Sequence, residues 1–439
     1  MVPGLALCLI AGAPATAQTL REALTSTYTT NPTLRAARAE LRAVNEEVPQ
    51  ALANWRPVIS LSGAYGAQRT ESQITSGTTT PFEATARVTQ PLYRGGRTIA
   101  GTQRAESRVQ AQRSILRSVE QSVLLRAATA HMGLWRDQAV VGLNRKNEAV
   151  LRRQLEASQD RFAVGEITRT DVAQSETRLA VAIADRVAAE GTLAASRAVF
   201  EEVVGIAPGA VRAAAPPEGL PAILEEAVSL AKAVNPDVMA ANFAEVAARR
   251  QVREVAGELW PTVSLEAKLS HSEEASFSNS ESDQAQILAQ VTVPLYQQGA
   301  VSSRIRQAKQ ISSQRRLEIE EARRRAEQEA IGAWQGLQTA RAQIRSFESG
   351  VRAAEIALEG VRQENAVGAR TVLDLLDAEQ ELLDSQVNLV RARRDEVVAG
   401  FQLSSAVGRL SARELGLSVE IYDPEIDYLK VRDRWFMLE

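Results

Sequence analysis

Residues 365–380 read N-A-V-G-A-R-T-V-L-D-L-L-D-A-E-Q, in which a glycine interrupts one pattern and a helical pattern begins shortly after it. Asp374 and Asp377 lie three positions apart, so both carboxylates are predicted on one face of the new helix. Aspartates at a helix start are often present only because negative charge is favoured at that end. These residues alone leave that structural interpretation and a functional one open.

The same turn occurs earlier in the chain. Residues 161–176 read R-F-A-V-G-E-I-T-R-T-D-V-A-Q-S-E. Gly165 precedes Gly368 by 203 positions, and Asp171 precedes Asp374 by the same number. The two glycines are therefore predicted at the tips of two helical turns, and only the second turn carries paired acids.

Other signatures recur at nearly the same offset, which indicates an internal duplication. The pair Asn-Pro occurs at 31–32 and again at 235–236, and Pro-Leu-Tyr occurs at 91–93 and again at 294–296. We expect a signal peptide at 1–17, a first repeat at 18–205, a linker at 206–221, a second repeat at 222–408 and a C-terminal tail at 409–439.

The beginning of the chain has the features of a secretory signal. Residues 1–17 have an apolar centre and end in Ala-Thr-Ala, which is typical of cleavage after Ala17. Cys8, the only cysteine, would leave with this signal, so no disulfide, thiol nucleophile or thiolate metal site is expected in the mature chain. No later run reaches the roughly 18 apolar residues of a membrane-spanning helix.

Composition favours long helices and argues against several functions. The 439 residues are 45% hydrophobic but only 4% aromatic, and 51 basic and 54 acidic residues are interleaved, so no basic face for nucleic acid is expected. No nucleophile–base pair or phosphate loop is present, so neither an enzyme nor a bound cofactor is expected. His131 and His271 are isolated in the sequence, so no metal site is expected at either.

Two segments, 56–93 and 260–296, alternate between polar and apolar residues and are predicted to be β-hairpins. Their strands, of about ten residues, are long enough to cross a bilayer when tilted. The predicted strands are 58–67, 82–92, 263–271 and 284–295, with polar turn material at 70–81. The predicted strand ends are Pro57, Pro91, Pro261 and Pro294.

Long helices are predicted around each turn. Between 97 and 164 there is neither a proline nor a glycine pair, which predicts one helix about 100 Å long. A shorter helix at 170–204 has heptads with many small residues, as in close-packed antiparallel coiled coils. The first repeat should begin with a short helix at 19–28, broken by the Asn-Pro pair at 31–32, and a second helix should then run to about residue 54.

Four strands per chain cannot close a barrel, and open sheet edges do not occur in lipid. Several copies of the chain are therefore expected to share one barrel. Three copies would supply 12 strands, but this argument does not fix the copy number.

The duplicated plan, the Asn-Pro and Pro-Leu-Tyr signatures, and V-G-x-R-T-x-x-D-x-x-D-A at 367–378 resemble the TolC family of outer-membrane efflux channels. The resemblance covers essentially the whole mature chain. It implies a mainly α fold with a membrane β-barrel part, in which a homotrimer forms a 12-stranded barrel continuous with a long α-helical coiled-coil barrel. Residues 421–435 look like the tail of members that serve type I protein secretion.

The resemblance also implies roles for residues at the two tips. Asp374 and Asp377 match the aspartates that line the periplasmic aperture, where their charge would make the entrance cation-selective. The residues implied in a latch that holds the entrance closed are Arg370, Asp171, Thr170 and Asn365, the last of which stands where the best-known member has tyrosine.

The implied function is an exit duct for type I protein secretion or efflux. It would lie in the outer membrane of a Gram-negative bacterium, in contact with outer-membrane lipid, and extend into the periplasm. Its implied partners are a periplasmic adaptor protein and an inner-membrane transporter of the ABC or resistance-nodulation-division type. The alternative is a soluble periplasmic coiled-coil adaptor, which would explain the helices and the signal but not the two hairpins.

Overall fold

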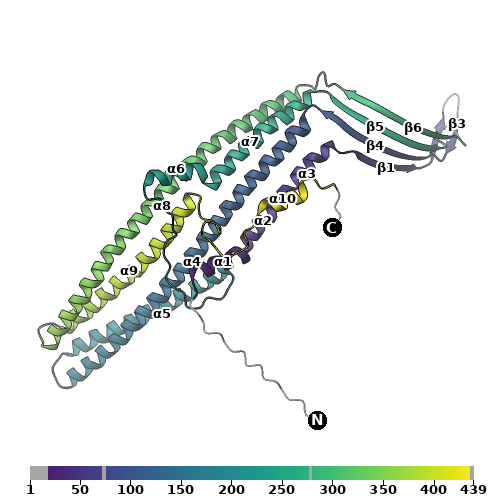
Figure 1. The fold of residues 1–439 in the computed structure, drawn as a ribbon. Coiled ribbons are helices and arrows are strands. Elements are labelled where there is room, and N and C mark those ends of the chain that lie inside the picture. Colours follow the sequence, from purple (N-terminus) through teal and green to yellow (C-terminus); the bar gives the residue numbers. More distant parts are fainter. Residues whose placement is uncertain (1–17, 72–75, 276–278, 436–439) are drawn as a thin grey trace, which may run out of the picture. The chain divides into compact units, whose positions relative to one another are not determined.

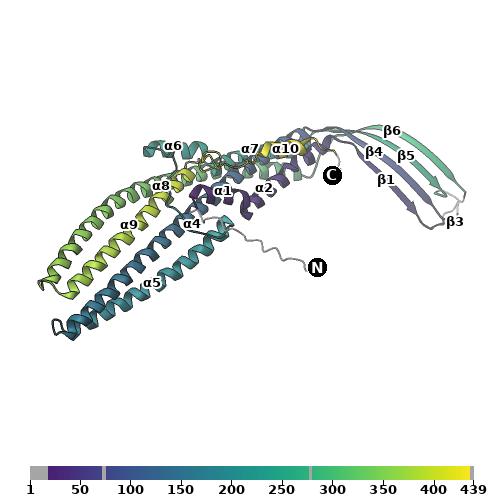
Figure 2. The ribbon, with the colours of Figure 1, turned by 60° about the horizontal axis from the view of Figure 1, so that its bottom comes forward.

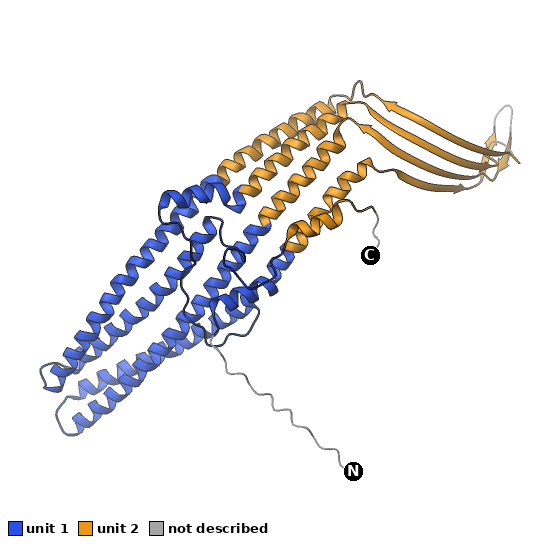
Figure 3. Ribbon diagram, in the orientation of Figure 1, with its two compact units in different colours: residues 1–37, 116–238, 323–422 blue, residues 38–115, 239–322, 423–439 orange. Residues whose placement is uncertain are grey.

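The computed structural model describes residues 18–71, 76–275 and 279–435, so the predicted signal peptide and Cys8 lie outside the described residues (Figure 1). The chain divides into two compact units (Figure 3). Unit 1 comprises residues 1–37, 116–238 and 323–422, and unit 2 comprises residues 38–115, 239–322 and 423–439. The two longest helices contribute residues to both units.

Unit 2 contains one four-stranded antiparallel sheet, in the order β1-β4-β5-β6 (Figure 1). Its strands are β1 (Val58–Tyr65), β4 (Phe82–Arg94), β5 (Thr262–Glu273) and β6 (Glu281–Thr292). All four predicted strands are present with shifted ends. The pairing of β4 with β5 joins the hairpins of the two repeats into a single sheet, and within the described chain β1 and β6 each have one neighbour.

The register gives this sheet two chemically different faces. One cross-strand row contains Ile59, Val88, Ala267 and Ile287. The adjacent row contains Ser60, Arg87, Lys268 and Gln286. Since successive residues of a strand point to opposite faces, one face of the sheet is largely apolar and the other largely polar.

Two expectations for the strands were wrong in detail. The segment expected as turn material contains a small hairpin of β2 (Gln68–Glu71) and β3 (Ser76–Thr79). Pro91 lies inside β4 rather than at its end, and the register with β5 shifts between Pro91 and Tyr93, because proline cannot donate to the ladder. Pro57 and Pro261 directly precede β1 and β5, and Pro294 follows β6 by two positions.

Four helices form the two hairpins of unit 1 (Figure 2). They are α4 (Arg97–Ala163), α5 (Arg169–Val204), α8 (Ala300–Ala366) and α9 (Val372–Ala406). The helices predicted at 97–164 and 170–204 agree with α4 and α5 to within one residue. Within the described residues, no helix has the length and hydropathy needed to cross a membrane.

Shorter helices precede each hairpin of strands. They are α1 (Leu20–Thr30), α2 (Pro32–Asn45), α3 (Glu47–Leu52), α6 (Leu224–Val234) and α7 (Pro236–Ala256), with the 3-10 turns η1 (Ala53–Trp55) and η2 (Gly257–Leu259). The second helix, expected to run to about residue 54, is divided into α2, α3 and η1. Pro49 accounts for this division, because proline is tolerated only in the first turn of a helix.

The repeated Asn-Pro pair has the same structural role in both repeats. The buried side-chain amide of Asn31 donates to the carbonyl oxygen of Val203 at 3.0 Å. The buried amide of Asn235 donates to the carbonyl oxygen of Ala406 at 3.2 Å. Each asparagine therefore ends one short helix and ties it to the last turn of α5 or α9, while the proline begins the next helix.

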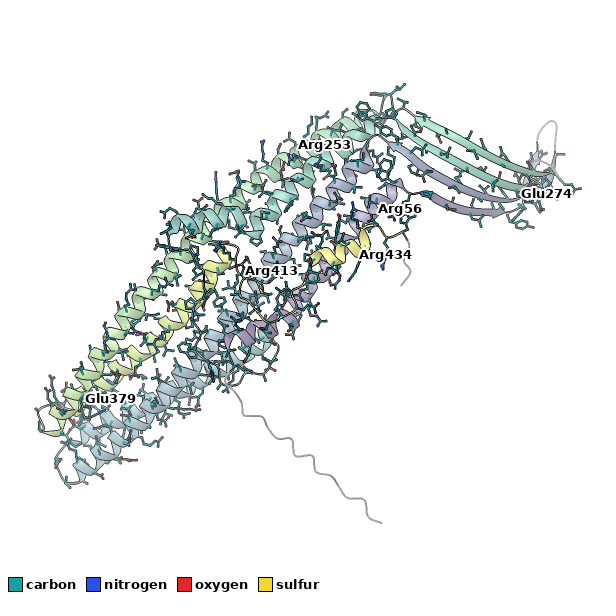
Figure 4. The ribbon with its side chains drawn as sticks, viewed as in Figure 1. Arg56, Arg253, Glu274, Glu379, Arg413 and Arg434 are labelled. Carbon is teal, nitrogen blue, oxygen red and sulfur yellow. The ribbon has the colours of Figure 1, made fainter. Side chains whose placement is uncertain are left out.

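The C-terminal tail, for which the sequence predicted no helix, contains α10 (Pro424–Arg432) in unit 2. Arg113 of α4 pairs with Glu425 at 2.5 Å, and its guanidinium lies 5.2 Å from the ring centroid of Tyr428. Arg56 donates to the carbonyl oxygen of Arg434 at 2.7 Å (Figure 4). These polar contacts hold a short helix that buries little apolar surface of its own.

Candidate functional site

The predicted tips at Gly165 and Gly368 are two turns with the same hydrogen bonds. In the first turn, the amide of Gly165 donates to Phe162 at 2.9 Å and that of Glu166 to Arg161 at 2.9 Å. In the second, the amide of Gly368 donates to Asn365 at 3.1 Å and that of Ala369 to Glu364 at 2.9 Å. Both glycines have a left-handed backbone, with φ of 80° and 78°, which this helix-ending motif requires.

Each following helix begins with a reciprocal cap. The Thr371 hydroxyl accepts from the Asp374 amide at 3.2 Å, and the Asp374 carboxylate accepts from the Thr371 amide at 3.0 Å. Thr168 and Asp171 form the same pair of bonds at 3.3 and 2.9 Å. Asp374 and Asp171 thus have a structural role in common, because each satisfies amide groups that a helix start leaves unpaired.

The cap also lowers the pKa of Asp374. Hydrogen bonds from the side chain and backbone of Thr371 stabilise the ionised carboxylate and lower its pKa, and the positive charge of Arg370 lowers it further. Since the folded-state pKa is depressed, the stabilisation is complete at neutral pH and is lost as the pH falls through the lowered pKa. Asp374 is therefore a permanent negative charge at neutral pH.

Asp377 contacts the other helical hairpin. Its carboxylate forms an ion pair with the Arg178 guanidinium of α5, and both side chains are partly exposed. Two positions further along α9, Glu379, labelled in Figure 4, pairs with Arg362 of α8 at 2.9 Å. The second hairpin is thus linked to the first through Asp377, whereas Glu379 links α9 to its own hairpin partner.

Of the predicted latch residues, Asn365 and Arg370 contact each other, but no hydrogen bond or ion pair joins either to Thr170 or Asp171 in the described part of the chain. Arg370 pairs with Glu364 at 2.8 Å across the turn, and this raises the Arg370 pKa. Asn365 is buried, and its amide donates to the carbonyl oxygen of Arg370 at 3.0 Å. The expected pair of Arg370 with Asp171 is not formed within the chain, and Thr170 lies exposed in the first turn of α5.

Beneath the tips, apolar side chains pack the two hairpins together. The cluster contains Leu151, Leu179, Ala182, Val372 and Leu376, with Leu155 and Ile183 against it. Because α4, α5 and α9 all contribute, the start of α9 and its two aspartates are held against the first hairpin.

Sequence reasoning missed three residues that define this site: Thr168, Thr371 and Arg178. The two threonines have a recognisable signal, since T-R-T-D and T-V-L-D both place a carboxylate three positions after a threonine that precedes a helix. Arg178 has no such signal, because its partner is 199 positions away along the chain.

Removing a cap is expected to loosen the start of its helix. Thr371→Ala should destabilise the first turn of α9 by about 1 kcal/mol, because the amide of Asp374 loses its acceptor. Hydrogen exchange of the amides at 372–375 measures this change, and Thr168→Ala should act likewise on α5. Thr170→Ala is the matched control, since Thr170 is exposed and makes no cap; equal exchange in all three variants would refute the role of the caps.

Comparison with known proteins identifies the family. The chain matches the family described as outer membrane efflux protein twice, over residues 23–205 and 227–409. The chain belongs to this family. The outer membrane efflux protein BepC of Brucella suis is 36% identical over 431 residues, which are 98% of this chain and 94% of BepC. The second match begins 204 positions after the first, in agreement with the predicted duplication.

One further relative and one solved structure are informative. The proteases secretion protein PrtF of Dickeya chrysanthemi is 28% identical, over 92% of this chain and 91% of PrtF. The Campylobacter jejuni CmeC outer membrane channel has the same fold, with a TM-score of 0.80 at 14% identity over 95% of this chain and 90% of CmeC. Family membership confirms the predicted location in the outer membrane and the class of efflux and secretion channels.

Proposed function

We propose that three copies of this chain form one channel that crosses the outer membrane and continues into the periplasm. The observation that carries this proposal is the four-stranded sheet, which has one apolar face and one polar face. Within the described chain its outer strands, β1 and β6, are each paired on one side only. Unpaired strand edges are too costly in lipid, so they must be satisfied by strands from other copies.

The resemblance to this family supports a copy number of three, which would give 12 strands. The apolar row through Ile59 and Ile287 would then face lipid, and the polar row through Arg87 and Lys268 would line the water-filled interior. The mass of the purified protein in detergent and its conductance in planar bilayers test the assembly together. A stable monomer without conductance would overturn it.

The periplasmic entrance is proposed at the tips of the second hairpin. Three copies would bring six carboxylates, from Asp374 and Asp377, to one narrow opening, where like charges favour cations over anions. Two features support this role. The pKa of Asp374 is lowered, so its charge persists at neutral pH, and Asp377 is more than half exposed.

Arg178 is proposed to restrain this entrance, because it connects Asp377 to the first hairpin. Arg178→Gln should raise the resting conductance of the reconstituted channel, as the second hairpin loses one anchor. An exposed ion pair contributes about 0–1 kcal/mol, so the expected rise is up to about fivefold per copy.

The control for this prediction is Arg186→Gln. Arg186 pairs with Glu148 and Glu190, which lie on α4 and α5 of the same hairpin, so this variant loses ion pairs without losing a link to α9. Equal resting conductance in the Arg178 and Arg186 variants would show that the link to Asp377 does not restrain the entrance.

The proposed partners are a periplasmic adaptor protein and an inner-membrane transporter. The relatives include both an efflux protein and a proteases secretion protein, so small molecules and type I secretion substrates are both candidate cargoes. Crosslinking in cells, followed by purification of the intact channel, distinguishes the two classes of cargo through the transporter that is recovered. Recovery of an ABC transporter indicates protein secretion, and recovery of a resistance-nodulation-division transporter indicates efflux.

A further inference from the structure

His271 lies in a group of carboxylates at the end of the sheet, although the sequence suggested no ligand partner for it. The register places His271 opposite Asp283 and Glu273 opposite Glu281, so all four side chains leave the same face of β5 and β6. Glu274, labelled in Figure 4, follows the last residue of β5 and marks this end of the sheet. Strand pairing therefore brings together residues that are up to twelve positions apart.

The two ring nitrogens of His271 have different surroundings. Nδ1 lies 2.7 Å from Asp283 Oδ1, and ligand atoms of His271, Asp283 and Glu281 all lie within 4.8 Å of one another. Nε2 lies on the other side of the ring, 3.2 Å from Glu273 Oε1. A histidine that binds a metal through one nitrogen commonly donates its other N–H to a carboxylate, which fixes the tautomer. Glu273 is placed for that orienting role.

We propose that His271 Nδ1, Asp283 and Glu281 form a binding site for a divalent transition-metal ion, with Glu273 orienting the imidazole. Two ligands bound to one zinc ion lie about 3.3 Å apart, since zinc–nitrogen and zinc–oxygen bonds are about 2.0–2.2 Å long. Nδ1 and Asp283 need to separate by only about half an ångström to reach this geometry. A water molecule would complete the fourth position of a tetrahedral site.

Charge and ligand type both favour such an ion. Three carboxylates surround one imidazole, and the Glu281 side chain has no hydrogen-bond or ion-pair partner in the described part of the chain, so the group carries excess negative charge. A nitrogen ligand with carboxylates suits zinc, whereas calcium and magnesium prefer oxygen ligands alone. The site uses one hairpin of a single chain, so it does not depend on the assembly proposed above.

The test is a calorimetric titration of the purified full chain in detergent with zinc. We expect one zinc ion to bind per chain. The ligand variants His271→Asn and Glu281→Gln should each lose at least about tenfold in zinc affinity. The orienting variant Glu273→Gln should lose about tenfold. Glu281→Gln is the decisive variant, because the Glu281 side chain makes no other hydrogen bond or ion pair among the described residues and the substitution should leave the fold intact. Glu71→Gln, at another exposed carboxylate of the same unit, is the control and should bind as the unaltered chain does.

Cobalt reports the coordination directly. Substituted Co²⁺ should give the intense visible bands of a four-coordinate site in the unaltered chain and in Glu71→Gln, but not in His271→Asn. Zinc affinity that is unchanged in Glu281→Gln and His271→Asn, or binding no tighter than that of calcium, would overturn the assignment.

Discussion

Replacing Asp374 and Asp377 together with asparagine is expected to weaken divalent-cation block of the single-channel current by at least about tenfold. That factor corresponds to about 1.4 kcal/mol of lost cation-binding free energy. This is a small loss for the removal of six negative charges around one opening. Asparagine keeps a side-chain oxygen that can accept the Thr371 amide hydrogen, so the variant removes charge while preserving the cap. Single-channel recording with magnesium on the periplasmic side measures the block.

The single variants separate the two aspartates. The Asp374 carboxylate is ionised and accepts a hydrogen bond from the Thr371 hydroxyl, whereas the Asp377 carboxylate forms an ion pair with Arg178 and is more exposed. Asp377→Asn should also release Arg178 and raise resting conductance, which Asp374→Asn should not do. Glu381→Gln, at an exposed position further along α9, is the control. Block that is equally strong in the double variant and in the control would remove the aspartates from the proposed entrance.

Placing a charge on the apolar face of the sheet should have a still larger effect. Ile287→Arg is expected to destabilise the folded channel in lipid by about 2–4 kcal/mol, the cost of arginine near the bilayer midplane. Ile287 is 75% exposed in the single chain, so the cost would come from lipid and not from packing within the chain. Urea unfolding from lipid vesicles measures the free energy directly.

Gln286→Arg provides a matched control one position away. Gln286 and Ile287 occupy neighbouring cross-strand rows on opposite faces of β6. The same new charge at Gln286 would face the water-filled interior, so it should change stability far less and should alter ion selectivity instead. Equal destabilisation by the two variants would contradict the assignment of the faces.

Local sequence patterns predicted most of the fold. Alternation of apolar and polar residues predicted all four strands of the sheet, because a half-buried strand requires that period. The absence of proline from 97 to 164 predicted α4 to within one residue. The expected coiled-coil hairpins and their tips at Gly165 and Gly368 follow from glycine's access to the left-handed backbone, which is a property of the residue itself.

The helices, the strands and the turns between them could be predicted from the sequence because each depends on residues close together in the chain, and the duplication is a repeat of such local patterns. Which distant residues meet could be seen only in the three-dimensional fold: β4 pairs with β5, Arg113 contacts α10, Arg178 pairs with Asp377, and His271 contacts Asp283. These contacts depend on strand register and on the packing of whole helices. A shift of one residue in register turns a strand's side chains to the other face, and no local pattern specifies which partner they then meet.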